Sequence, residues 1–167
     1  RKWAHLGELM RERGHLGAAA EHYGRAWSRV GDRYESVSNK YALALIELSR
    51  LEEAQKVLEG SLVTHPGSGP TNVHLGRLAL KKGDWATART AYQGALDVNP
   101  MDPEVHVALV RIYGQLGDKA LLARARADAA LLLGLDAAKV EELARTFGRD
   151  ASLVDPLSGE GIYFAAR

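Results

Sequence analysis

The sequence predicts an all-α fold, a stack of about four helical hairpins closed by a capping helix. Three observations support this prediction. Similar segments recur about every 34 residues along the 167-residue chain. Apolar residues within these segments are spaced three and four apart, which is typical of amphipathic helices. Glycine and proline stand where the helices would end.

The repeat is clearest where a turn leads into the second helix of each hairpin. Ala88 in the third copy stands 34 residues after Ala54 in the second copy. Ala19 in the first copy precedes Ala54 by 35 residues, so one residue is inserted near positions 32–34. The fourth copy begins at Gly117 and is the most degenerate.

Each copy also has an earlier half that predicts the first helix of the hairpin. These halves cover residues 3–10, 38–45, 72–79 and 106–113. Small residues recur at equivalent positions and allow the two helices of a hairpin to approach closely; they include Gly7, Gly76, Ala19, Ala54 and Ala88. Three glycines supply the left-handed turn after a first helix, and two prolines end second helices. These turn and end residues are Gly14, Gly83, Gly117, Pro66 and Pro100.

A capping helix is predicted after the fourth copy, because a stack of hairpins needs a last element with a polar outer side. Asp136 is a typical N-cap for a helix over residues 137–147. Its inward face would carry Val140, Leu143, Ala144 and Phe147, and its outward face Lys139, Glu141, Glu142 and Arg145. Four hairpins and this cap make nine predicted helices.

Residues from Trp3 to about Gly134 resemble the tetratricopeptide repeat family, whose pattern is Trp, Leu-Gly and Tyr, then Ala, an aromatic residue, Ala and Pro. The resemblance implies a right-handed superhelical stack. It also implies that the first helices line a concave groove, which binds a peptide or helix of a partner protein. We therefore expect a non-catalytic protein–protein interaction module. Two alternatives are a regulatory or substrate-presenting domain excised from a larger enzyme, and self-assembly through exposed repeat faces.

Stepping by the repeat offset from Glu8 gives a row of four positions on the expected groove, and further residues flank it. The expected peptide-binding residues are Glu8, Asn39, Leu43, Glu47, Val73, Arg77, Lys81, Arg111 and Gln115. Arg77 and Arg111 would form a cationic patch suited to a carboxylate or an acidic side chain. The alternative is that both are ordinary solvated arginines.

The family's two-carboxylate clamp, found in heat-shock co-chaperones, is not expected here. That clamp is made of Lys, Asn and Arg side chains. The matching positions in this chain are Ala4, Glu8, Lys40, Pro70 and His74. Binding of a chaperone's free C-terminus is therefore disfavoured.

Composition and missing motifs narrow the other functions. The formal net charge is +1, so nucleic acid binding is not expected. The chain has no cysteine, its six histidines are scattered, and it contains none of the common hydrolytic signatures. We expect no enzyme activity, metal or cofactor, and no membrane insertion, because the apolar stretches are too short to span a bilayer. The expected partner is a protein or peptide with acidic groups, and the expected location is cytoplasmic.

A repeat domain with its capping helix is expected over residues 1–148, and a tail over 149–167. The tail resembles the second flavin-contacting motif of geranylgeranyl-reductase-like flavoproteins, with Asp155-Pro156 and Gly159-x-Gly161. Arg149 stands where that family has glycine, a helix precedes the motif in place of a strand, and no dinucleotide-binding motif lies upstream. Flavin binding is therefore not expected. The apolar cluster at 162–164 suggests instead that the tail docks on its own stack or on a neighbouring molecule, or is disordered.

Overall fold

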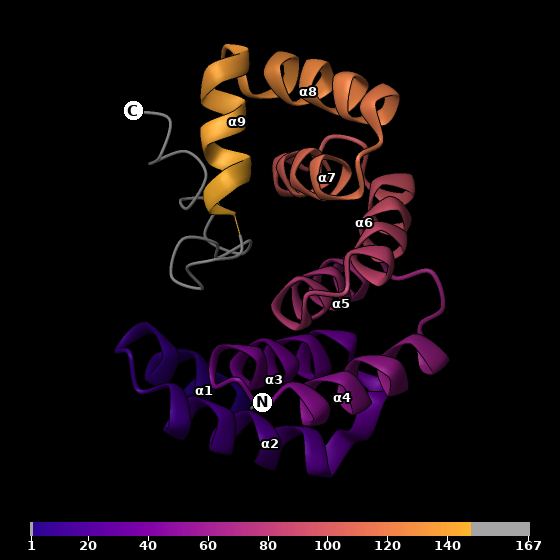
Figure 1. The fold of residues 1–167 in the computed structure, drawn as a ribbon. Helices are drawn as coiled ribbons and strands as arrows, with labels where there is room; N and C mark the ends of the chain where they lie inside the picture. Colours follow the sequence, from indigo (N-terminus) through magenta and orange to yellow (C-terminus); the bar gives the residue numbers. More distant parts are fainter. Residues whose placement is uncertain (1, 148–167) are drawn as a thin grey trace. The chain divides into compact units, whose positions relative to one another are not determined.

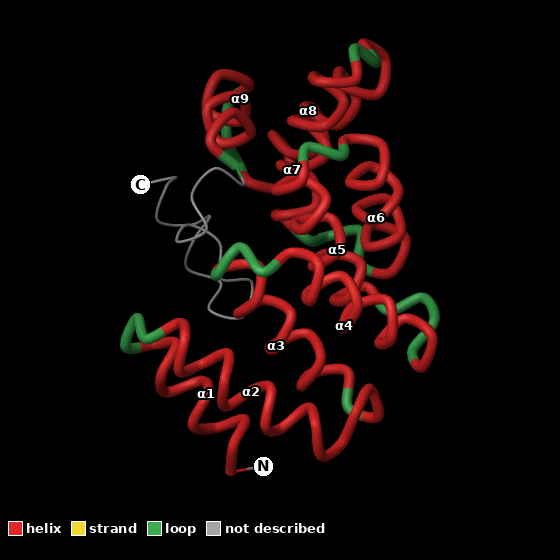
Figure 2. The backbone as a smooth tube through the Cα atoms, turned by 60° about the horizontal axis from the view of Figure 1, so that its bottom comes forward, coloured by secondary structure: helices red, strands yellow, loops and turns green. Residues whose placement is uncertain are grey.

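The computed structural model describes residues 2–147, and all of their regular structure is helical (Figures 1 and 2). Nine α-helices and one short 3-10 helix lie within this range, which confirms the predicted all-α class and the predicted number of α-helices. The chain divides into two compact units, one ending at Leu78 and the other beginning at Ala79. The predicted tail, 149–167, lies outside the described residues, so the domain boundary at 148 stays a prediction.

The first unit contains two helical hairpins and the start of a fifth helix. Its elements are α1 (Lys2–Glu12), α2 (Leu16–Val30), the 3-10 helix η1 (Gly31–Arg33), α3 (Glu35–Glu47), α4 (Leu51–Thr64) and α5 (Gly69–Lys82), which continues into the second unit. Gly14, between α1 and α2, has a φ of 76°, as predicted for a left-handed turn. Ser49 takes the same role between α3 and α4 with a φ of 59°.

Small residues allow the helices of the first unit to pack closely, as the sequence predicts. A Cβ added to Gly7 on α1 would lie 2.7 Å from the ring of Tyr23 on α2. Ala19 and Ala54 are fully buried. The helices α1, α2 and α3 share one apolar cluster around Tyr23, and α3, α4 and α5 share another around Leu45.

The one-residue insertion of the first repeat forms η1, and Asp32 in η1 joins three neighbouring helices. Its Oδ1 accepts hydrogen bonds of 3.0 Å from Trp27 Nε1 on α2 and from Ser38 Oγ on α3. Its carbonyl oxygen lies 2.8 Å from His65 Nε2, directly after α4. Asp32, in the segment that contains the insertion, therefore forms a polar junction between the first two hairpins.

In the second unit, the other helices pack around the deeply buried helix α7 (Pro103–Leu116). After the last turn of α5 this unit contains α6 (Trp85–Val98), α7, α8 (Lys119–Leu133) and α9 (Ala137–Thr146). In α7 all residues from Glu104 to Val110 are buried, and α7 contacts α6, α8 and α9 (Figure 1). The predicted turn glycines Gly83 and Gly117 have φ values of 74° and 72°. Both are left-handed, as predicted.

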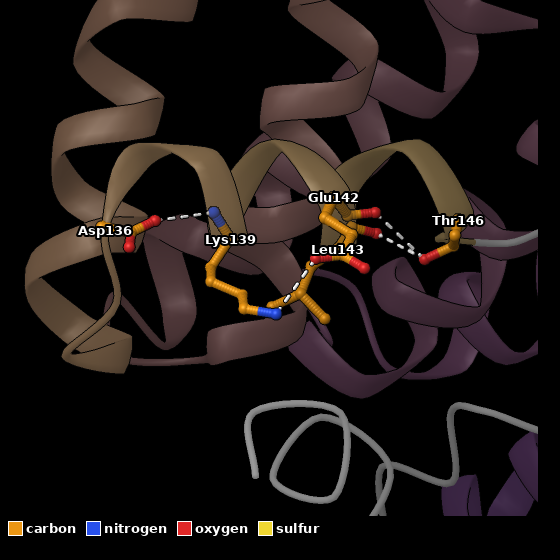
Figure 3. A network of polar contacts seen from close by, with 5 residues as sticks. All are labelled: Asp136, Lys139, Glu142, Leu143 and Thr146. Atoms are coloured by element: carbon orange, nitrogen blue, oxygen red, sulfur yellow. Dashed lines mark hydrogen bonds and ion pairs between the residues drawn. The ribbon is translucent and has the colours of Figure 1, made fainter.

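The predicted cap is present as α9, which packs on α7 and α8. Asp136 is its N-cap and accepts a 2.9 Å hydrogen bond from the backbone nitrogen of Lys139 (Figure 3). Val140, Ala144 and Phe147 are buried, as predicted for the inward face. The Phe147 ring meets Tyr92 edge-on at 6.3 Å, so the end of the cap is anchored on α6.

Candidate functional site

Two of the predicted groove residues in the first unit form ion pairs between neighbouring helices. Glu8 on α1 accepts a 2.8 Å hydrogen bond from Lys40 Nζ on α3. Glu47 on α3 lies 3.3 Å from Arg11 on α1. Both carboxylates therefore tie the first helices of two successive hairpins together.

Three other predicted residues, Asn39, Leu43 and Val73, are buried, with 6%, 5% and 6% of their surface exposed. Asn39 Oδ1 accepts a 3.0 Å hydrogen bond from the Thr71 hydroxyl at the start of α5. Its Nδ2 donates to Glu35 on α3 at 3.5 Å. Asn39 thus belongs to a polar junction between α3 and α5. For all three residues, contact with a partner stays a prediction.

Arg77 lies half-buried on α5, one turn after His74, whose side chain is buried. Burial, together with the positive charges of Arg77 and Arg11, lowers the pKa of His74 to about 3. His74 is therefore neutral at physiological pH. It adds no positive charge to Arg77.

The second unit carries the remaining predicted residues: Lys81 at the end of α5, and Arg111 and Gln115 on α7. Lys81 and Gln115 are exposed, and Arg111 is half-buried. The guanidinium carbon of Arg111 lies 5.2 Å from the centre of the Trp85 ring on α6, a cation–π contact that fixes the position of the charge.

Arg111 and Gln115 line an open cleft of about 180 Å³, which we call the α7–α8–α9 cleft after the helices that form it. Its apolar part consists of Val110 on α7, Leu122 on α8 and Ala144 on α9. Gly114 also lines it, and a Cβ at this position would meet no atom within 4 Å. The cleft therefore has an apolar floor and, beside Gly114, an open space that a larger side chain at this position would fill.

The rim of the α7–α8–α9 cleft is charged and carries more arginines than carboxylates. Arg126 on α8 and Glu141 on α9 form an ion pair across it, and Arg145 lies one turn further along α9. With Arg111, the lining carries three arginines and one glutamate. The cleft is therefore locally cationic, although the whole chain has a formal net charge of only +1.

The structure does not test whether the nine predicted residues bind a peptide, but it brings two of them, Arg111 and Gln115, into one cleft. The residues that α8 and α9 contribute were missed because the prediction placed the groove only on first helices. A signal was present in the sequence. Val140 and Ala144 were expected to face inward, which sets Glu141 and Arg145 at the border of that face.

Two further findings concern metals and membranes. Among residues 2–147, no group of three or more His, Asp or Glu side chains is arranged to hold a metal ion. Within the same part of the chain, no helix combines the length and the apolar character needed to cross a bilayer.

Solved structures share this helical architecture. A structure titled "Crystal structure of MamA protein" has a TM-score of 0.72 and 17% identity, covering 98% of this chain and 87% of its own. PilW, titled a widely conserved type IV pilus biogenesis factor, has a TM-score of 0.72 and 18% identity, covering 98% and 73%. The fold is a tetratricopeptide-like helical repeat. A further MamA structure gives a TM-score of 0.65 at 21% identity over 78% of this chain and 74% of that one. No protein-family model and no curated protein matches the sequence.

Proposed function

We propose that this protein is a non-catalytic interaction module that binds an acidic segment of a partner protein in the α7–α8–α9 cleft. The observation that carries the proposal is the lining of this cleft by Arg111, Arg126 and Arg145 against the single carboxylate of Glu141. A guanidinium group can donate two parallel hydrogen bonds to a carboxylate. Aspartate and glutamate side chains are therefore the ligands that this rim favours.

The size of the cleft supports a peptide as ligand. Pockets for drug-sized molecules and cofactors enclose roughly 300–1,000 Å³, and this cleft encloses about 180 Å³. It has room for one side chain of a longer segment, while the rest of the segment would lie along the charged rim. A protein partner fits these dimensions better than a small-molecule substrate.

Selection from a displayed library of random peptides, with the full chain as bait, tests this function. We expect the selected peptides to be enriched in Asp and Glu. Arg145→Glu places a second carboxylate on the rim, so it should weaken binding of the selected peptides by about tenfold, measured by fluorescence polarisation.

The matched control is Arg124→Glu. Arg124 is on α8, one of the helices that form the cleft, but it does not line the cleft and its side chain is 83% exposed. This variant has the same net charge as Arg145→Glu and should keep the wild-type affinity. Selected peptides without acidic enrichment, or equal losses in the two variants, would refute the proposed function.

A further inference from the structure

We infer that the opening over Gly114 receives one large apolar side chain, so that the cleft recognises a leucine-sized residue flanked by acidic residues. This inference rests on the proposed function and specifies the chemistry of its ligand. Three features point to such a ligand: the position of Gly114 in the repeat, the space around it and the side chains below it.

The repeat register shows that the opening is particular to the fourth hairpin. Stepping back from Gly114 by the repeat offsets of 34, 34 and 35 residues gives Leu80, Ile46 and Arg11. The first helices of the other three hairpins thus carry a long side chain at this position. Only in α7 does the equivalent position leave the space beside the helix empty.

Packing does not explain a glycine at position 114. A Cβ at Gly7 would lie 2.7 Å from Tyr23, and one at Gly24 would lie 3.2 Å from Tyr41, whereas one at Gly17 on α2 would meet nothing within 4 Å. A Cβ at Gly114 would meet nothing within 4 Å. A glycine inside a helix lowers helix stability relative to alanine, so the sequence keeps an open space here without any gain in packing.

The floor of this space is apolar, and its rim is cationic. Val110 and Ala144 are buried to 1% and 2% exposure, and Leu122 is half-buried beside them. An apolar side chain placed over Gly114 would cover this floor and leave water. The residues before and after it would then lie beside Arg111, Arg126 and Arg145, which favour carboxylates.

The test uses three synthetic fluorescent peptides with the full chain. The first has one leucine between two aspartates on each side, the second has alanine in place of leucine, and the third has asparagine in place of every aspartate. The first peptide should bind best. Loss of the leucine should weaken binding by about tenfold, and loss of the carboxylates should weaken it by a similar factor.

Gly114→Leu gives α7 the kind of side chain that the other hairpins carry and fills the opening. It should weaken binding of the leucine peptide by at least about tenfold and change binding of the alanine peptide by less than about threefold. The control is Gly17→Leu on α2, because a Cβ there also meets nothing within 4 Å and Gly17 lies outside the cleft. Circular dichroism would confirm that both variants stay helical.

The outcomes separate this inference from the proposed function. If Arg145→Glu weakens binding but Gly114→Leu does not, the apolar anchor is refuted and the acidic site stands. If neither variant changes binding, both ideas fail. A dimer of the wild-type chain that Gly114→Leu dissociates, seen by sedimentation, would make a second copy the occupant and would also overturn the inference.

Discussion

His74 shows how burial changes the chemistry of a single side chain on an inner helix. The sequence places it where the family's clamp has a cationic residue, but the structure buries it beside Arg77. Burial and the neighbouring guanidinium groups of Arg77 and Arg11 favour the neutral imidazole. Arg11 is itself paired with Glu47. A neutral side chain therefore stands at the position where the clamp has a cation, which agrees with the expectation that this chain lacks the clamp.

The lowered pKa of His74 predicts a loss of stability in acid. An unfolded histidine binds a proton below its ordinary pKa of 6.5, whereas buried His74 stays neutral down to about pH 3. Between these values the unfolded state holds more protons, so stability falls as pH falls. We expect the free energy of unfolding to be about 2 kcal/mol lower at pH 5 than at pH 7 from this residue alone. Urea denaturation at the two pH values measures it.

His74→Gln is the comparison variant, because glutamine does not titrate. The wild type should lose about 2 kcal/mol more of its free energy of unfolding between pH 7 and pH 5 than His74→Gln does. An equal pH dependence in the two proteins would show that His74 is not responsible.

Other single residues show what sequence reasoning could not supply. The repeat offset identifies equivalent positions such as Arg111, which lines the same cleft as the flanking residue Gln115. It does not give the depth of each side chain. Asn39 is buried, and the Thr71 hydroxyl donates a hydrogen bond to it there. Thr71 lies on another helix, more than thirty residues away in the sequence. Such a polar junction depends on side-chain geometry that a periodic pattern does not specify.

At the scale of elements, close helix contacts follow from small residues, and Gly7 is the clearest case. A Cβ at this position would lie 2.7 Å from the Tyr23 ring, which is 1% exposed. The sequence predicted this contact because the repeat pattern alone selects a small residue there. The short helix η1 was not predicted as such, because a one-residue insertion shows an irregularity but not its conformation.

Gly7→Ala should reduce stability. The added methyl group would lie 2.7 Å from two carbons of the Tyr23 ring, so the buried ring or the two helices must shift. Overpacking of this kind costs about 1–3 kcal/mol, which outweighs the roughly 1 kcal/mol that alanine gains in helix propensity. Thermal unfolding followed by circular dichroism should show a lower melting temperature.

Gly17→Ala on α2 is the matched control, because its methyl group would enter open space. It should leave the melting temperature unchanged or raise it. Equal melting temperatures of Gly7→Ala and Gly17→Ala would show that α1 and α2 do not need a glycine at position 7 in order to pack together.

At the scale of the whole molecule, the all-α class, the nine helices of residues 2–147 and the cap at Asp136 were predictable. They depend on local signals: the apolar spacing, the turn glycines and an N-cap residue. The site was predictable only in part. The cleft forms where α8 and α9 pack beside α7. Its residues come close only after folding and do not occupy equivalent repeat positions, so the repeat pattern does not reveal them.

The net charge of the whole chain bears on the proposed function. A formal net charge of +1 gives no long-range attraction for an acidic partner. The proposed recognition of an acidic segment therefore relies on a local excess of one sign, which the α7–α8–α9 cleft has with three arginines and one glutamate. We propose that this cleft is the binding surface of the protein.

Amide chemical-shift mapping with the leucine–aspartate peptide tests this claim most directly. As the peptide is added, we expect the largest shifts on the residues that line the cleft, including Gly114, Gln115 and Arg145, while α1 and α2 stay unchanged. Shifts confined to α1–α4, or no shifts at peptide concentrations up to about 1 mM, the weak limit of specific binding, would contradict it.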